Sequence, residues 1–289
     1  MITDPFTHRS RLEEGRIINT ANAEIWVHDT GGSGEPVFLI GGFTAGHFVF
    51  DLIRPFMQNY RLITWEPRGL GLSRANSGID TELNADVWAA DAAEVLDILG
   101  IDCAKVWATG FGSYIAFALT AMYPQKVSAL ATYTDVWAED ETKVYERIWA
   151  VYSAIVENFG IEGFGARVLA NVFDVTGLPW FGDWEAHNIE QVLRLETVND
   201  TVGYCCTRAD VRSHLPKIAA PVLIVQGGLS WDGEVVKETS DPSLSLLQES
   251  ISGLEVVTIA GAHPAYVLVQ QPEACAAAVR GFFERENSG

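Results

Sequence analysis

Short, almost wholly apolar segments recur along the chain, and patterns typical of helices separate most of them. The apolar segments span 36–40, 60–65, 105–108, 128–133, 221–226 and 254–259, after an alternating segment at 24–28. Helical spacing of apolar residues covers 84–99, 111–122 and 272–284. Strands that are apolar on both faces are typical of a parallel sheet covered by helices on both sides. We therefore expect the α/β fold class, with a mostly parallel central sheet.

The segment 137–212 breaks this rhythm, because it is rich in Trp, Phe and Tyr and has no strand-like run. It predicts a helical cap inserted into a core formed by 1–136 and 213–289. Ligands of such sheets bind beyond the carboxyl ends of the strands. A cap at that end would close a lidded, apolar pocket.

Charge and composition exclude several classes of protein. The formal net charge is −19 and the pI is about 4.6, which disfavours binding to nucleic acid or to anionic lipid. No apolar run approaches the ~20 residues that span a bilayer, and the first ten residues lack the apolar region of a signal peptide. The four cysteines form no CxxC pair. We expect a cytoplasmic protein with no metal and no organic cofactor, and the oligomeric state stays open.

Four motifs stand in a fixed order along the chain. Gly41-Gly-Phe43 follows an apolar segment, and 66–73 reads Glu-Pro-Arg-Gly-Leu-Gly-Leu-Ser. A strand, a Gly-rich turn and a helix occupy 99–116, and Gly261-Ala-His263 follows the last apolar segment. Together these motifs resemble the α/β-hydrolase fold superfamily over nearly the whole chain outside 137–212. The resemblance implies an oxyanion loop, a nucleophile elbow and a catalytic histidine.

The elbow departs from the family's Gly-x-Ser-x-Gly pattern at its central position. Counting forward from Leu99-Gly100 and back from Tyr123-Pro124 places the nucleophile position on Gly110, which has no side chain. Only a shift of three residues would bring Ser113 there. A glycine at this position is similar to the N-myc downstream-regulated family, which shares the fold and lacks the nucleophile. Whether Gly110 is natural or replaces a serine stays open.

The resemblance also implies the other members of a catalytic site. His263 takes the position of the catalytic base, and its orienting acid is Asp232 or Asp135, between which the sequence does not choose. The backbone N–H groups of Phe43 and Phe111 would form the oxyanion hole. The residues expected to line the substrate pocket are Gly42, Thr109, Trp137, Trp180, Phe181 and Trp184.

These residues favour an enzyme that forms no covalent serine intermediate. His263 would act as a general base and the two amides would stabilise an oxyanion. An activated substrate suits such a site: a small-to-medium apolar lactone, activated ester or β-dicarbonyl compound. Two alternatives stay open, a non-catalytic ligand-binding relative of the hydrolases and a cofactor-free lyase or oxygenase.

Overall fold

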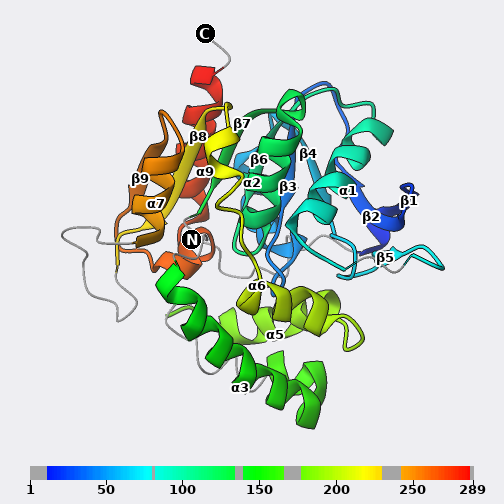
Figure 1. Cartoon of the computed structure of the whole chain (residues 1–289). Coiled ribbons are helices and arrows are strands. Elements are labelled where there is room, and N and C mark those ends of the chain that lie inside the picture. Colours follow the sequence, from blue (N-terminus) through cyan, green and yellow to red (C-terminus); the bar gives the residue numbers. More distant parts are fainter. Residues whose placement is uncertain (1–11, 80–81, 134–138, 166–176, 230–241, 287–289) are drawn as a thin grey trace.

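The computed structural model describes residues 12–79, 82–133, 139–165, 177–229 and 242–286, and Figure 1 gives an overview. Within these residues one sheet has the strand order β1-β2-β4-β3-β6-β7-β8-β9, with β5 paired to β2. The strands are β1 (Arg16–Asn19), β2 (Ala23–Asp29), β3 (Glu35–Ile40), β4 (Tyr60–Trp65), β5 (Arg74–Ala75), β6 (Ala104–Ala108), β7 (Val127–Thr132), β8 (Val222–Gly227) and β9 (Glu255–Ile259).

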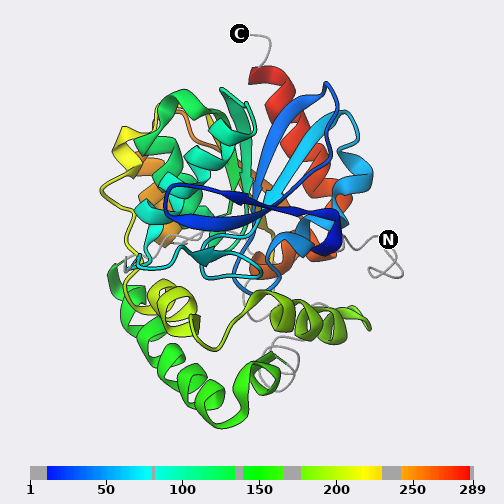
Figure 2. The ribbon, with the colours of Figure 1, turned by 90° about the vertical axis from the view of Figure 1, so that its right-hand side faces the viewer.

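The sheet is parallel from β4 through β9 and antiparallel only where β2 pairs with β1, β4 and β5. Every residue of β6 and β8 is buried, as expected for strands covered on both faces. In Figure 2, α1 (Ala85–Ile98) and α2 (Gly112–Met122) lie on one side of the sheet, and α9 (Pro272–Glu286) lies on the other. The predicted α/β class with a mostly parallel central sheet is therefore confirmed.

Helix α1 shows how local sequence fixes an element of the fold. Its N-cap is Asn84, whose side-chain oxygen accepts a hydrogen bond of 3.0 Å from the Val87 amide. Trp88, among the apolar side chains on the buried face of α1, is fully buried. The helix stops before Gly100, which adopts a φ of +68° that glycine favours. The predicted helix over 84–99 agrees with these bounds.

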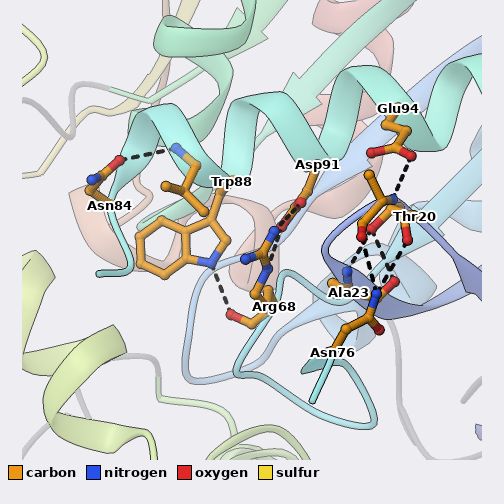
Figure 3. Close-up of polar contacts among 10 residues, drawn as sticks. Thr20, Ala23, Arg68, Asn76, Asn84, Trp88, Asp91 and Glu94 are labelled. Carbon is orange, nitrogen blue, oxygen red and sulfur yellow. Dashed lines mark hydrogen bonds and ion pairs between the residues drawn. The ribbon is translucent and has the colours of Figure 1, made fainter. Parts of the chain in front are cut away.

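The Gly-rich turn at 66–73 is held by a buried ion pair (Figure 3). Arg68 contacts the carboxylate of Asp91 in α1 through two hydrogen bonds, of 3.0 and 2.6 Å. The indole N–H of Trp88 donates to the Arg68 carbonyl at 2.9 Å. Burial raises the pKa of Asp91, although the Arg68 guanidinium acts in the opposite direction. Glu66, at the start of the turn, contacts the ring of His47 in a second buried pair.

Helices α3 (Glu139–Phe164), α5 (Phe181–Val192) and α6 (Tyr204–Thr207) are inserted between β7 and β8. Figures 1 and 2 show these inserted helices gathered beyond one end of the sheet. The end of α5 and the segment after it are attached to the Gly-rich turn. The Thr197 hydroxyl donates to the Gly69 carbonyl at 2.6 Å, and the Gly71 amide donates to the Val192 carbonyl at 2.7 Å. The domain boundaries at 137 and 212 stay a prediction.

The remaining helices complete the second half of the chain. Helix α7 spans Pro242–Ser250 and α8 spans Val267–Gln270, between β9 and α9. None of the described helices is long and apolar enough to cross a bilayer.

Candidate active site

A tight turn joins β6 to α2, and its geometry depends on Gly110. Gly110 has a φ of +53°, a left-handed conformation that costs an L-residue strain. A Cβ built on Gly110 would lie 3.7 Å from the Gly42 Cα and would meet no other described residue within 4 Å, its chain neighbours aside. The turn therefore joins a strand to a helix through a left-handed residue and has space for a side chain at residue 110.

Ser113 lies inside α2 rather than at the turn. Its side chain is fully buried, and its hydroxyl oxygen accepts a 2.7 Å hydrogen bond from Thr132 at the end of β7. A buried hydroxyl held in this way has no route to a substrate in front of Gly110.

A small cavity of about 80 Å³ opens beside this turn. Gly42 and Thr109, two of the residues expected in the pocket, line it, and so does Gly110 at the expected nucleophile position. The other described residues around it come from the loop after β3, from the residue after β7, from α5 and from the segment after β9. They are Thr44, Ala45, Val49, Tyr133, Glu185, Tyr266, Leu268 and Val269. The cavity thus lies where the carboxyl ends of β3, β6 and β7 meet the inserted helices, which is the usual ligand site of such sheets.

The sequence predicts the backbone amides of Phe43 and Phe111 as an oxyanion hole. A Cβ built on Gly42 would lie 3.6 Å from the Phe111 nitrogen, which places that amide next to the loop after β3. Across the part of the chain that the structure describes, the amides of Phe43 and Phe111 donate to no other backbone group. The two Phe rings are 5.8 Å apart, so the two loops are in contact. Both amides therefore stay candidate donors to a ligand oxygen.

His263 follows β9 and is only 2% exposed. Its backbone N–H donates to the Gln270 side chain at 2.7 Å, and its ring lies 5.8 Å from the ring of Tyr266. Tyr266 in turn lines the cavity. The structure therefore brings the histidine segment to the same end of the sheet as the Gly110 turn.

The remaining predicted site residues divide into two groups. Asp135, Trp137 and Asp232 lie outside the described residues. Trp180, Phe181 and Trp184 belong to the start of α5, where Trp184 packs against the other two rings. None of these three is among the described residues that line the cavity; Phe181 reaches its border only through Tyr266, 4.9 Å away between ring centres.

Glu185, which was not predicted from the sequence, is the described residue of α5 that lines the cavity. Its carboxyl group is 4% exposed and forms a side-chain hydrogen bond with Thr44. Burial raises the pKa of Glu185 to about 7, because the charged form loses its hydration there. A sequence signal did exist: Glu185 stands one residue after Trp184, on the same buried stripe as Phe181 and Ile189.

The raised pKa of Glu185 predicts a specific dependence of stability on pH. The folded state keeps the proton up to about pH 7, whereas the unfolded state releases it near 4.5. The unfolded state binds fewer protons in this window. The contribution of Glu185 to the free energy of unfolding is therefore fully present below about pH 4.5 and is lost as the pH rises to 7, by roughly 3 kcal/mol. Urea unfolding from pH 5 to 8 should show that Glu185→Gln removes this component. Parallel curves for the two proteins would contradict it.

The strand order, the Gly110 turn and the inserted helices show that the chain has the α/β-hydrolase fold. A family model for this fold matches residues 35–164. The 2-hydroxymuconate semialdehyde hydrolase of Pseudomonas sp. (strain CF600) is 33% identical over 121 residues, 41% of this chain and 42% of that protein. This chain therefore matches less than half the length of that relative.

Solved structures extend the likeness to almost the full chain. An enol-lactonase from Burkholderia xenovorans LB400 has a TM-score of 0.72 at 15% identity, covering 91% of this chain and 97% of that chain. A structure from a study of carboxylesterases of the thaumarchaeon Nitrososphaera gargenis has a TM-score of 0.76 at 16% identity, covering 94% and 99%. At these identities the likeness shows the fold alone.

Proposed function

We propose that this protein is an enzyme that acts on a small, apolar carbonyl compound without a covalent serine intermediate. The substrates that suit it are a lactone, an activated ester or a β-dicarbonyl compound. The observation that carries the proposal is the cavity itself, which is lined by the bare Gly110 turn and by Gly42, next to the Phe111 amide. The hydrolases and esterases among the similar proteins support a small-molecule carbonyl substrate.

In the proposed mechanism, water takes the place of the missing nucleophile. His263 removes a proton from the water as its oxygen attacks the substrate carbonyl carbon. The negative charge that develops on the carbonyl oxygen is stabilised by the amides of Phe43 and Phe111. A carboxylate that orients the imidazole is part of this proposal, with Asp135 and Asp232 as the two candidates. With a β-dicarbonyl compound the same base and amides would form and stabilise an enolate.

Labelling with a fluorophosphonate probe tests the absence of a serine nucleophile. The protein as sequenced should form no adduct at any serine, read by intact mass and peptide mapping, because residue 110 has no hydroxyl and Ser113 is buried. An adduct on Ser113 or another serine would contradict the proposal and would indicate an ordinary covalent hydrolase.

Gly110→Ser is expected to raise esterase activity on p-nitrophenyl acetate above that of the unmodified protein. The Cβ fits with ordinary contact to Gly42, and the hydroxyl would stand at the cavity beside the two amides. The variant should also react with the fluorophosphonate, which makes it the positive control for the labelling. Gly110→Ala, which adds the same backbone strain without a hydroxyl, should gain neither property. A folded Gly110→Ser protein without either gain would contradict the assignment of this turn as an elbow.

The favoured alternative function is ligand binding without turnover, and the missing hydroxyl is the observation that favours it. The same cavity would then hold an apolar molecule. Replacement of His263, considered in the Discussion, separates the two functions.

A further inference from the structure

Glu185 is the side chain through which the inserted helices bring an ionisable carboxyl group to the cavity. It lies in the middle of α5, on a buried stripe made of Phe181, Trp184, Glu185, Asn188, Ile189 and Val192. This spacing turns one face of the helix toward the protein interior, so Glu185 is directed inward by the same geometry that buries its apolar neighbours. The cavity that it lines also contains Thr109 and Gly110.

A buried carboxylate is normally paired with a cation. No Lys or Arg is among the described residues that line this cavity, and the partner of Glu185 is the side chain of Thr44. Its other titratable surroundings are Tyr133 and Tyr266, which line the cavity. His263 lies beside Tyr266. Burial raises the pKa of Tyr266, and the nearby Glu185 and Tyr152 add to this shift. These neighbours supply no positive charge unless His263 is protonated, so the carboxyl group keeps its proton up to about pH 7.

We propose that Glu185 is the general acid of this site and protonates the leaving oxygen of an ester or lactone. The proposal rests on the function proposed above and adds a residue and a role to it. It assigns the departing group to the side of the cavity that Glu185 of α5 lines. An ester or lactone with a poor leaving group, such as an alkoxide, needs this protonation.

The proton balance of the step is complete without any further reagent. His263 takes one proton from water, and the remaining hydroxide oxygen forms a bond to the carbonyl carbon. As the tetrahedral oxyanion collapses, the bond from that carbon to the leaving oxygen breaks, and the Glu185 carboxyl gives its proton to that oxygen. The product acid and alcohol are then neutral. The imidazolium of His263 and the carboxylate of Glu185 return to their starting forms when one proton passes from the former to the latter through solvent.

The dependence of the rate on the leaving group tests this role. We would measure kcat/KM for δ-valerolactone, whose leaving group is an alkoxide, and for p-nitrophenyl acetate, whose leaving group needs little protonation. Glu185→Gln should lower the first value by about 10²–10⁴ and the second by less than about tenfold. The Gln side chain keeps the size of the Glu side chain and its hydrogen-bonding capacity but has no proton to transfer. Glu190→Gln is the matched control, because Glu190 lies on the exposed face of the same helix and should leave both values unchanged.

The pH profile gives a second readout on the unmodified protein. Its kcat/KM for the lactone should fall as the pH rises through about 7, where Glu185 loses its proton, and this limb should be absent for p-nitrophenyl acetate. An equal loss of kcat/KM on both substrates in Glu185→Gln would overturn the general-acid role and leave the proposed function standing. So would a kcat/KM for the lactone that does not fall as the pH rises through about 7 in the unmodified protein. Lack of turnover of both compounds by the unmodified protein would overturn the proposed function, and the general acid with it.

Discussion

His263→Ala is expected to lower turnover of an activated ester or lactone by about 10²–10⁴ while ligand affinity stays nearly unchanged. The imidazole follows β9 at the end of the sheet where the cavity opens, and it contacts the ring of Tyr266, which lines that cavity. In the proposed mechanism the imidazole is the base that activates water, so its loss removes the attacking nucleophile. The cavity walls formed by Gly42, Thr109 and Leu268 would remain.

The measurement combines steady-state kinetics with calorimetric binding of a non-hydrolysable ketone analogue. His187→Ala is the control, because His187 is exposed on α5 and its removal should change neither turnover nor binding. If the unmodified protein binds the analogue but turns over no ester or lactone, and His263→Ala binds equally well, the ligand-binding alternative is the correct function. A His263→Ala protein that keeps full turnover would exclude this histidine as the base.

Asp91→Ala is expected to destabilise the fold by about 3–5 kcal/mol, because it leaves the Arg68 guanidinium buried without its carboxylate. The side chains of Arg68 and Asp91 are 4% and 3% exposed, so water cannot replace the lost partner. The effect should be visible as a lower midpoint of urea unfolding. It should also loosen the turn at 66–73 and, with it, the attachment of the segment after α5 through Gly69 and Gly71.

Two companion variants separate loss of a partner from loss of a charge. Glu255→Ala breaks the exposed pair with Arg285, whose side chains are 46% and 57% exposed, and should cost only about 0–1 kcal/mol. The double variant Arg68→Met with Asp91→Leu removes both buried charges and should recover most of the stability lost in Asp91→Ala. A loss in Asp91→Ala no larger than that in Glu255→Ala would contradict the assigned role of the buried pair.

Much of the fold follows from short-range sequence patterns. The strand predicted at 60–65 matches β4, and Asn84 and Gly100 mark the two ends of α1. These elements were predictable because caps, breakers and apolar runs act over a few residues. The short strands β1 and β5 were not, since each is stabilised by pairing with β2 rather than by its own composition.

The candidate site was predictable only in part. Gly42, Thr109 and Gly110 could be placed at the cavity because motifs of fixed spacing follow β3 and β6. The cavity-facing residue of the inserted helices could not be placed by counting aromatic residues, since Trp180 and Trp184 pack against each other within the helical layer. The polar member of the apolar stripe of α5, Glu185, was the better signal, because a carboxyl group is buried only where tertiary structure gives it a use or a partner.

The left-handed backbone of Gly110 also bears on how such a site can change over evolutionary time. An L-residue at a φ of +53° carries a conformational cost of about 1–2 kcal/mol, which glycine does not. If the turn is the proposed elbow, glycine in place of serine would relieve this strain and would remove only the covalent reaction. A lineage whose chemistry has moved to other groups would retain the glycine under selection for stability alone, and return to serine would require renewed selection for the covalent reaction.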